Sequence, residues 1–313
     1  MTTRTLPMTE PATGLPDRIT IYEVGPRDGL QNEKSVVPVE VKAEFVRRLV
    51  DAGLQTIELT SFVPAAWVPQ LGDAEELLDL LGPVAAGQAR PVLVPNERGL
   101  DRALDKGVKA IAVFGSATET FARKNLNRSV AESLAMFEPV VRGALDAGAW
   151  VRGYVSMCFG DPWEGPVPVE QVVDVCARLM DLGCDQLSIG DTIGVGTPGH
   201  VSRLLEALEG AGIGADQVGV HFHDTYGQAL SNTMTALAHG VRVVDASTGG
   251  LGGCPYAKSA TGNLATEDLV WALDGLGIEH GADLDALVET SVWMAQQLGR
   301  PSPSRVVKAL AGA

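Results

Sequence analysis

The sequence predicts an α/β protein built as a single (β/α)8 TIM barrel with a C-terminal helical extension. The same pattern recurs along the chain: the end of a predicted helix, then a glycine, then a predicted strand. One example is the helix end Asp181-Leu182-Gly183, which precedes the predicted strand at residues 185–189. The strands follow one another at a spacing of roughly 30 residues, which is typical of βα units. Eight strands can be counted, and eight is the number that closes a parallel barrel.

Strand and helix signals alternate from residue 19 onward. The first strand, residues 19–24, ends at the breaker Gly25-Pro26, and a helix over residues 39–52 has apolar residues at helical spacing before the capping glycine Gly53. The other strands are predicted over residues 56–59, 91–94, 109–114, 150–157, 185–189, 217–222 and 241–247. A glycine-rich loop and helices over residues 263–276 and 283–298 come last.

An open doubly wound sheet is the alternative architecture. Such sheets often carry a Gly-x-Gly-x-x-Gly turn after the first strand, and this chain has none there. Polar residues instead follow nearly every strand, which is typical of a barrel, where active sites lie at the carboxyl ends of the strands. The pattern therefore favours the barrel.

Length and composition fit one large domain. The chain has 313 residues, of which 45% are hydrophobic, enough to fill a barrel core. We expect residues 1–17 to form a flexible N-terminal tail and residues 18–313 to form a single TIM-barrel catalytic domain that includes the C-terminal helices.

Charge and cysteine content narrow the class of partner. A formal net charge of -15 argues against a nucleic-acid or anionic-membrane surface, and no apolar run approaches the roughly 20 residues of a membrane helix. The four cysteines follow no zinc or redox spacing, and residues 1–17 resemble neither a signal peptide nor a transit peptide. We expect a cytoplasmic enzyme with reduced thiols and a small-molecule partner.

Two histidines end the seventh predicted strand. His221 and His223 are separated by one residue, so their side chains share one face of a strand and can bind the same metal ion. The alternative is a polar strand end whose histidines are only hydrogen-bonded. The choice depends on whether further ligands reach the same rim of the barrel.

Two oxygen donors are candidates for those further ligands. Asp28 follows the first strand, and Asn263 lies just beyond the glycine-rich loop. Two imidazoles, a carboxylate and an amide oxygen suit a six-coordinate ion such as Mg2+ or Mn2+ better than zinc. The structural alternatives are a helix cap or turn for Asp28 and a cap of the following helix for Asn263.

Cys254 is a candidate for proton transfer. It lies among four glycines, where the backbone can move, and a thiol near a cation titrates closer to neutrality. The alternative is a small buried apolar residue, which is the favoured interpretation for Cys158, Cys176 and Cys184. Glu58, at the exit of the second strand, has the alternative of a buried ionic partner for Arg27.

Several motifs resemble those of the 3-hydroxy-3-methylglutaryl-CoA lyase family. They run in the same order from about residue 19 to the end of the chain, and the GLGGCPYA loop is absent from the related isopropylmalate and homocitrate synthases. The motifs are GPRDGLQNE (25–33), TSFVPAAWVPQLGD (60–73), KNLNRS (124–129), VRGYVS (151–156), GDTIGVGTPG (190–199), VHFHDTYGQALSNT (220–233) and GLGGCPYAKSATGNLATEDLV (250–270).

The resemblance implies a retro-Claisen cleavage, in leucine breakdown, by a homodimer. It implies that Arg27 contacts the thioester carbonyl, that Cys254 takes part in proton transfer and that Glu58 and Asp191 complete the acid-base network. The implied metal ligands are Asp28, His221, His223 and Asn263. The resemblance also implies that His221 is catalytic.

An acyl-CoA substrate requires positive charge for its phosphates. Arg123, Lys124 and Arg128 form the densest basic cluster near the predicted rim, and Lys124 is the residue we expect to bind substrate. The alternative is an ordinary solvated surface.

The chain also departs from the family motifs, and the departures concern the choice of acyl group. Pro64, Ala65 and Ala66 replace a serine- and lysine-containing segment, and the lead into the glycine loop, Thr248-Gly249-Gly250, also differs. A lyase for a related substrate, such as citramalyl-CoA or a longer branched homologue, is therefore an alternative. Less favoured alternatives are an acyltransferase acting on acetyl-CoA and 2-oxo acids, and a barrel with a structural metal only.

Overall fold

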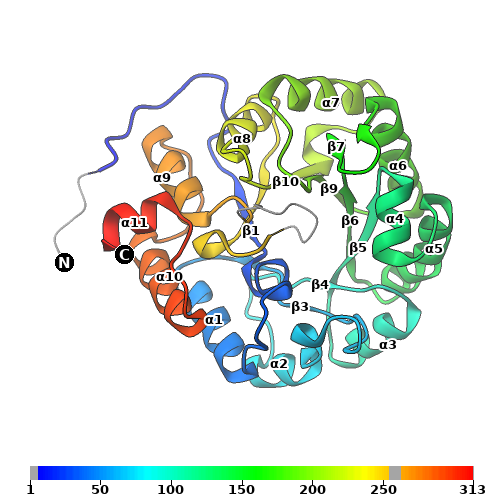
Figure 1. The fold of residues 1–313 in the computed structure, drawn as a ribbon, viewed down its shortest axis with the longest axis horizontal. Helices are drawn as coiled ribbons and strands as arrows, with labels where there is room; N and C mark the ends of the chain where they lie inside the picture. The colour runs from blue at the N-terminus through cyan, green and yellow to red at the C-terminus, as the bar shows by residue number, and fades with distance from the viewer. Residues whose placement is uncertain (1–5, 254–261, 313) are drawn as a thin grey trace.

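A computed structural model describes residues 6–253 and 262–312 and shows a barrel of parallel strands surrounded by helices (Figure 1). The strands pair in the order β2-β1-β11-β10-β9-β6-β5-β4-β3, and every pairing in this sheet is parallel. The barrel strands are β1 (Thr20–Glu23), β2 (Thr56–Ile57), β3 (Thr60–Ser61), β4 (Val92–Leu93), β5 (Ala110–Ser116), β6 (Trp150–Ser156), β9 (Gln186–Asp191), β10 (Val218–Phe222) and β11 (Val243–Ala246). The predicted fold class is confirmed.

The second predicted strand, residues 56–59, is divided in the structure into β2 and β3. On one side Glu58 donates its backbone N–H to Glu23, and on the other Leu59 donates to Pro91. Pro91 has no N–H to donate in return, which explains why the ladder is interrupted here. Because residues 56–62 are bonded on both sides, the sheet closes on itself.

Helices follow the strands as the periodicity predicts. In α1, Phe45, Val46 and Leu49 are buried against the barrel, and the last barrel-flanking helices pack beside α1 (Figure 1). The helices are α1 (Val39–Asp51), α2 (Ala74–Leu81), α3 (Glu97–Asp105), α4 (Glu119–Leu126), α5 (Val130–Asp146), α6 (Val169–Leu182), α7 (Pro198–Gly210), α8 (Ala229–Ala238), α9 (Thr266–Leu276), α10 (Leu284–Leu298) and α11 (Arg305–Ala311).

Three details differ from the sequence-based boundaries. The helix predicted over residues 263–276 begins only at Thr266, after Ala265 as its N-terminal flanking residue. The helix predicted from residue 283 begins at Leu284, because Asp283 caps it by accepting hydrogen bonds from the backbone of Asp285 and Ala286. A short antiparallel hairpin, β7 (Gly160–Asp161) and β8 (Gly165–Pro166), extends the loop after β6.

The N-terminal segment lies along the C-terminal part of the barrel. Glu10 donates its backbone N–H to the carbonyl of Gly275, and the carbonyl of Asp17 accepts from Glu279. The division into a tail over residues 1–17 and a domain over residues 18–313 stays a prediction. None of the helices in the described ranges is long and apolar enough to cross a membrane.

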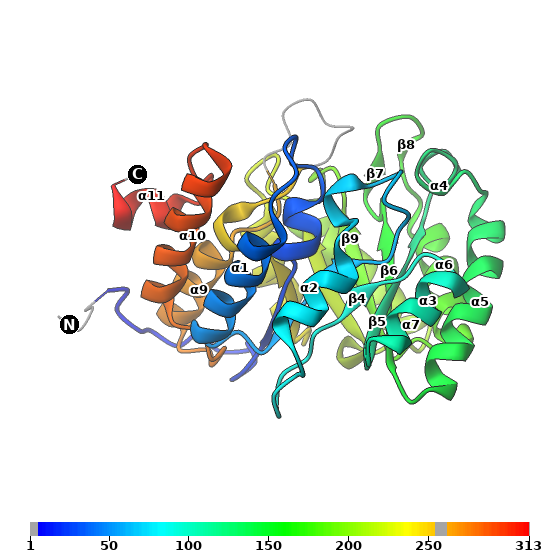
Figure 2. The same cartoon turned by 90° about the horizontal axis from the view of Figure 1, so that it is seen from below.

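The barrel interior contains a buried charged layer between the two ends. Arg152 on β6 and Asp245 on β11 are fully buried and form an ion pair across the barrel, with 2.7 Å between Nη2 and Oδ1. The guanidinium also lies over the ring of Tyr22, 3.9 Å from its centroid. Figure 2 shows the barrel from the side, with β7 and β8 at one end and the loop after α2 at the other.

Candidate metal centre

The two histidines of the seventh strand point to one place. His221 lies in β10, and His223 follows it at the carboxyl end, where it forms an isolated bridge with Asn263. Their Nε2 atoms are 3.2 Å apart, and both side chains are buried. The strand periodicity therefore places both imidazoles on the same face, as the sequence predicted.

Asp28 reaches the same point from the first strand. It lies in a π-helical turn, Gly25–Gly29, that follows β1, and its Oδ2 is 3.9 Å from Nε2 of His221. One ligand atom from each of Asp28, His221 and His223 can be chosen so that all three lie within 4.8 Å of one another. The aspartate thus faces the histidines across the barrel mouth rather than capping a helix.

Asn263 completes the set. Its Nδ2 donates to Oδ2 of Asp28 at 2.8 Å and to the carbonyl of Leu251 at 3.0 Å. It makes no capping bond to α9, so the alternative of a helix cap is wrong. All four predicted ligands are therefore together.

The spacing of these groups fits one divalent ion. Ligands about 2.1 Å from an octahedral ion are about 3.0 Å apart in adjacent positions and about 4.2 Å apart in opposite positions. The separations of 3.2 Å between the histidine nitrogens and 3.9 Å between Asp28 and His221 fall in or near this range. Imidazole nitrogens and carboxylate oxygens are both common ligands of divalent metal ions.

Electrostatics keep these groups in the protonation states that bind metal. Burial lowers the pKa of His223 to about 4, so the imidazole is neutral near pH 7. Burial would raise the pKa of Asp28, but the charge of Arg27 outweighs it and the pKa lies below its usual range. A neutral imidazole and an ionised carboxylate are the forms that coordinate a cation.

A carboxylate behind the histidines orients one of them. Oδ2 of Asp245 lies 3.1 Å from Nδ1 of His221 and also accepts a hydrogen bond from Ser188. Burial would raise the pKa of Asp245, but Arg152 and His221 hold it below the usual value, so Asp245 is ionised. Carboxylates in this position fix the ring and tautomer of a metal-binding histidine.

Arg27 lies beside the ligands and is held by two carboxylates. Its Nε donates to Oε2 of Glu58 at 2.7 Å, and its Nη1 donates to Oδ1 of Asp28 at 2.7 Å. Tyr154 donates its hydroxyl to the same Oε2 of Glu58 at 3.1 Å. The ionic contact between Arg27 and Glu58, which the sequence left as an alternative role for Glu58, is present.

Burial also affects the acidity of Glu58. Burial raises the pKa of the Glu58 carboxyl, and Arg27 offsets only part of this effect. The side chain is fully buried, and it lies behind Arg27 and Tyr154 rather than on the wall of the cavity. Glu58 therefore contacts the site through these two neighbours.

Asp191 lies at the end of β9 but points to a loop. Its carboxylate accepts hydrogen bonds from the backbone N–H groups of Val195 at 3.0 Å and Gly196 at 2.8 Å. Burial raises the pKa of Asp191 to about 6. Its neighbours Gly190 and Thr192 line the cavity at the metal centre, whereas the Asp191 side chain does not.

A cavity of ≈ 530 Å³ opens over the metal ligands. Arg27, Asp28, His221 and His223 form one end, and Gly253, the last described residue before the gap, also lines it. Cys254 lies outside the described residues. The other walls are mainly apolar and come from Val63, Trp67, Val68, Leu93, Pro95, Phe114, Phe121, Leu126 and Val155.

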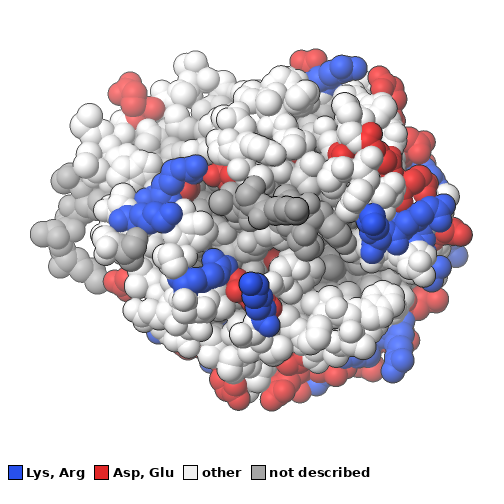
Figure 3. All heavy atoms as spheres, in the orientation of Figure 1, with Lys and Arg blue, Asp and Glu red and all other residues white. Residues whose placement is uncertain are grey.

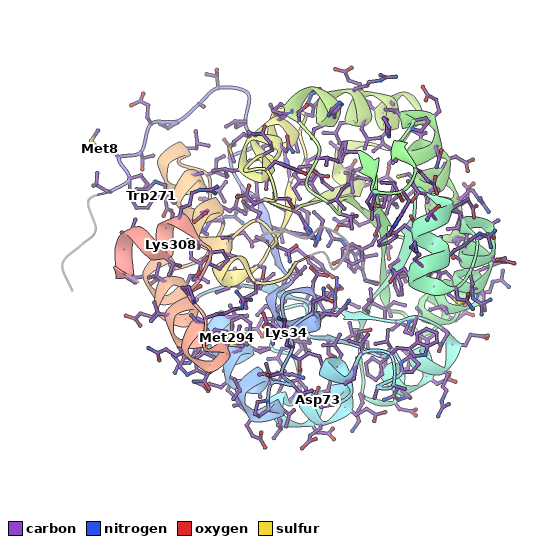
Figure 4. The ribbon with its side chains drawn as sticks, viewed as in Figure 1. Met8, Lys34, Asp73, Trp271, Met294 and Lys308 are labelled. Carbon is purple, nitrogen blue, oxygen red and sulfur yellow. The ribbon has the colours of Figure 1, made fainter. Side chains whose placement is uncertain are left out.

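The predicted substrate-binding lysine lies away from the metal ligands. Lys124 is exposed on α4, and its Nζ lies 4.8 Å from the ring centroid of Trp163, while the next residues, Asn125 and Leu126, line the cavity. Figure 3 shows basic side chains on two sides of the barrel mouth. Lys34, labelled in Figure 4, lies beside the turn that carries Arg27 and Asp28.

Comparisons with known proteins agree with this architecture. The family model described as HMGL-like matches residues 18–293. The chain is 50% identical over 296 residues to the mitochondrial hydroxymethylglutaryl-CoA lyase of Rattus norvegicus, covering 94% of this chain and 90% of that protein. It is 48% identical to the mitochondrial hydroxymethylglutaryl-CoA lyase of Arabidopsis thaliana, of which it spans 63%.

Solved structures show the same likeness. A crystal structure of hydroxymethylglutaryl-CoA lyase from Pseudomonas aeruginosa superposes with a TM-score of 0.93 at 44% identity. The match covers 96% of this chain and 99% of that one. The likeness therefore extends over the whole barrel and the C-terminal helices.

Proposed function

The chain belongs to the HMGL-like family, and we propose that it is a metal-dependent carbon-carbon lyase that cleaves 3-hydroxy-3-methylglutaryl-CoA into acetyl-CoA and acetoacetate. The observation that carries the proposal is the convergence of Asp28, His221, His223 and Asn263 beside Arg27 in one cavity. High identity to lyases of this name over nearly the whole chain supports the choice of substrate.

The reaction transfers one proton from oxygen to carbon. The tertiary hydroxyl of the substrate loses its proton, the bond between C2 and C3 breaks, and C3 becomes the ketone of acetoacetate. The electron pair of the broken bond passes to the thioester as an enolate. Protonation of C2 then gives acetyl-CoA, so the reaction needs a base for the hydroxyl and an acid for C2.

The four ligands would hold a divalent ion at the end of the cavity. When bound, the ion supplies Lewis-acid polarisation of a substrate oxygen and a fixed orientation for the substrate. His223 and Asp28 are ready to bind it because their pKa values keep one neutral and the other ionised. Asp245 fixes the ring of His221 from behind.

Arg27 is positioned to stabilise the enolate. It lines the cavity, carries a permanent positive charge and is kept in place by Glu58 and Asp28. A cation fixed where negative charge develops lowers the barrier because it needs no reorganisation during the reaction. Glu58 supports this role by fixing Arg27 and by accepting the hydroxyl proton of Tyr154 in a hydrogen bond.

Proton transfer requires groups that titrate near the working pH. Asp191, with its pKa raised to about 6, is a candidate because its neighbours Gly190 and Thr192 line the cavity, although its own carboxylate is turned toward the loop after β9. Cys254 is a second candidate, assigned from its motif, and the residue before it in the chain lines the cavity. We propose that Cys254 returns a proton to the substrate carbon.

The rest of the cavity suits the pantetheine arm of coenzyme A. Its walls beyond the metal end are mainly apolar. Lys34 lies beside the turn that carries Arg27 and Asp28, and Lys124 directly precedes Asn125 and Leu126, which line the cavity, so we propose that both lysines neutralise phosphates. We also propose Mg2+ or Mn2+ as the ion. Homodimer formation and a place in leucine breakdown are further proposals, supported by the family resemblance alone. A cytoplasmic location is a separate proposal, which relatives named as cytoplasmic support and relatives named as mitochondrial do not.

The decisive experiment is cleavage of a panel of CoA esters by protein reconstituted with Mg2+ or Mn2+. The panel contains 3-hydroxy-3-methylglutaryl-CoA, citramalyl-CoA and a longer branched homologue, with the His223→Ala variant as the inactive control. We expect acetyl-CoA and acetoacetate from the first ester and little product from the others. Preferential cleavage of another ester would reassign the substrate, and release of free CoA from acetyl-CoA and a 2-oxo acid would indicate an acyltransferase.

A further inference from the structure

A second, larger cavity lies at the opposite end of the barrel. Its volume is ≈ 1090 Å³, and its walls combine the first residues of several strands, such as Thr20, Ala110 and Gln186, with the loop over residues 82–91. Figure 2 shows that this loop projects from the end of the barrel opposite the β7–β8 hairpin. The cavity is therefore separate from the metal centre, which lies at the carboxyl ends of the strands.

Arg90 lies in the wall of this cavity and has no carboxylate partner, unlike the other buried or half-buried arginines and lysines that the structure describes. Among the arginines and lysines that the structure describes as buried or half-buried, all the others have a carboxylate within 4.0 Å. The contacts of Arg90 are hydrogen bonds from Nη1 to the carbonyl oxygens of Leu81 and Gly82. In a chain with a net charge of -15, an unpaired half-buried guanidinium is unexpected.

The arginine also has unused hydrogen-bonding capacity. Its Nε is buried and has no partner among the described residues. Nη1 is occupied by the loop carbonyls, so Nη2 is the nitrogen that remains for a carboxylate. Nε is covered, and it joins Nη2 in two parallel hydrogen bonds to a carboxylate only when the side chain turns toward the cavity. Partial burial, with no carboxylate to offset it, lowers the pKa of Arg90.

Three residues that line the same cavity also have a buried polar atom without a hydrogen-bond partner among the described residues. The hydroxyl of Tyr22, a residue only 1% exposed, and the side-chain carbonyls of Gln88 and Gln186 are buried without hydrogen-bond partners in the described structure. Buried polar groups in folded proteins are almost always hydrogen-bonded. The Tyr22 hydroxyl lies toward the charged layer of Arg152 and Asp245, whereas Gln88 and Gln186 are on the cavity wall. Their unpaired carbonyls leave hydrogen-bonding capacity beside the cavity that a polar ligand can use when these side chains turn toward it.

We propose that this cavity binds a small carboxylate with an apolar body. The carboxylate pairs with Arg90, and Lys109 at the cavity wall adds a second positive charge. The apolar body packs against Leu78, Val84 and the indole of Trp150, which line the same cavity. Pockets of this kind, mainly apolar with a few converging polar groups, are typical of small-molecule sites.

The test measures binding of hexanoate to the full-length, Mn2+-loaded protein by calorimetry, with Trp150 fluorescence as a local reporter. We expect Arg90→Leu to weaken hexanoate binding by about tenfold or more, because a charge-assisted bidentate pair is lost. Arg90→Lys, which keeps the charge but not the fork, should give an intermediate affinity. Arg98→Leu, at an exposed arginine in α3, is the matched control and should bind as the wild type does.

Three results would overturn the assignment. They are equal affinity in the wild type and the Arg90→Leu variant, a fluorescence response that persists in Trp150→Phe, and binding of inorganic phosphate as tight as that of hexanoate. Cleavage of the CoA ester is measured on the same variants and should be unchanged in Arg90→Leu. The two measurements are independent of each other. Absence of hexanoate binding would refute the carboxylate site but not the proposed lyase activity, and absence of cleavage would refute the lyase activity but not the carboxylate site.

Discussion

Asp245 and His221 form a carboxylate-histidine pair in which Oδ2 lies 3.1 Å from Nδ1. The other ring nitrogen of His221, Nε2, faces His223 at 3.2 Å. Because Asp245 is ionised, it accepts a hydrogen bond from the N–H at Nδ1 of His221. The proton of the neutral ring therefore stays on Nδ1, and Nε2 keeps a free lone pair. The pair therefore selects the tautomer that can bind a metal ion.

We expect Asp245→Asn to weaken Mn2+ binding by about 10- to 100-fold, because the asparagine no longer fixes that tautomer. Isothermal calorimetry gives the affinity. The substitution also leaves Arg152 buried without its carboxylate, which costs about 3–5 kcal/mol, so unfolding must be measured in parallel.

Asp161→Asn is the matched control for this variant. Asp161 is another buried carboxylate, but it accepts hydrogen bonds from Thr118 and from the β7–β8 turn instead of from a ligand. Its loss should lower stability without changing the Mn2+ affinity. Equal loss of affinity in both variants would mean that Asp245 acts only through the fold.

Removal of a direct ligand should have a larger effect than removal of Asp245. A residue that only hydrogen-bonds to a metal ligand, as Asp245 does, contributes up to roughly 100-fold to metal affinity. We expect His223→Ala to lower the Mn2+ affinity by more than this and to abolish cleavage. His239→Ala is the control, since His239 is a half-buried histidine that hydrogen-bonds to Ser202 and belongs neither to the metal ligands nor to the cavity lining. Normal metal binding by His223→Ala would remove His223 from the ligand set.

Glu58 should act through Arg27. We expect Glu58→Gln to lower kcat about 100-fold while the Mn2+ affinity and KM change little, because a misplaced cation weakens transition-state stabilisation. A double-mutant cycle with Arg27→Met tests the pathway. If Glu58 positions Arg27, the double variant is no slower than Arg27→Met alone, whereas additive losses would assign Glu58 a separate step.

The barrel and the metal ligands could be predicted from the sequence because their signals are local. Side chains along a strand point alternately to its two faces, which places His221 and His223 on the same face. The repeated pattern of helix, glycine and strand predicts the order of the elements. Eight parallel strands then bring Asp28 to the same rim without any knowledge of side-chain contacts. Asn263 was a candidate from its place just beyond the glycine-rich loop and from the family resemblance, not from barrel closure.

The network behind the ligands was not predicted, because it depends on contacts across the closed barrel. Arg152 and Asp245 are 93 positions apart in the chain, and only the register of β6 and β11 brings them together. Asp245 lies in the predicted strand 241–247 and Arg152 in the VRGYVS motif, so the sequence placed each on its strand. Neither placement indicated the partner. The split of the second strand at Glu58 depends similarly on Pro91 in the neighbouring strand.

The buried Glu267 should make the stability of the fold depend on pH. Burial raises the pKa of Glu267 to about 8 in the folded protein, against about 4.3 for an unperturbed glutamate. Between these values the folded state holds a proton that the unfolded state has released. The free energy of unfolding should therefore fall by about 1.4 kcal/mol for each pH unit as pH rises toward 8, and this contribution should level off above it.

Chemical denaturation at several pH values, with Glu267→Gln beside the wild type, measures this effect. The glutamine does not titrate, so the variant should lack the slope between neutral pH and pH 8. Glu279→Gln, at an exposed glutamate paired with Arg18, serves as the control and should keep the slope. A wild-type slope equal to that of Glu267→Gln would show that Glu267 is ionised throughout.

Cys254 lies outside the described residues, and its role can be tested through its described neighbour. Gly253 lines the metal cavity and accepts a hydrogen bond from Asn32 at 2.9 Å, and consecutive Cα atoms are about 3.8 Å apart. We expect Cys254→Ala to keep the wild-type Mn2+ affinity and to lose about 100-fold or more in turnover, because a thiol that transfers a proton is removed. Cys158→Ala, at a buried thiol whose pKa is raised by burial, should retain its turnover. Full turnover in Cys254→Ala would assign the final protonation to another group, and a parallel loss of metal affinity would make Cys254 part of the metal site instead.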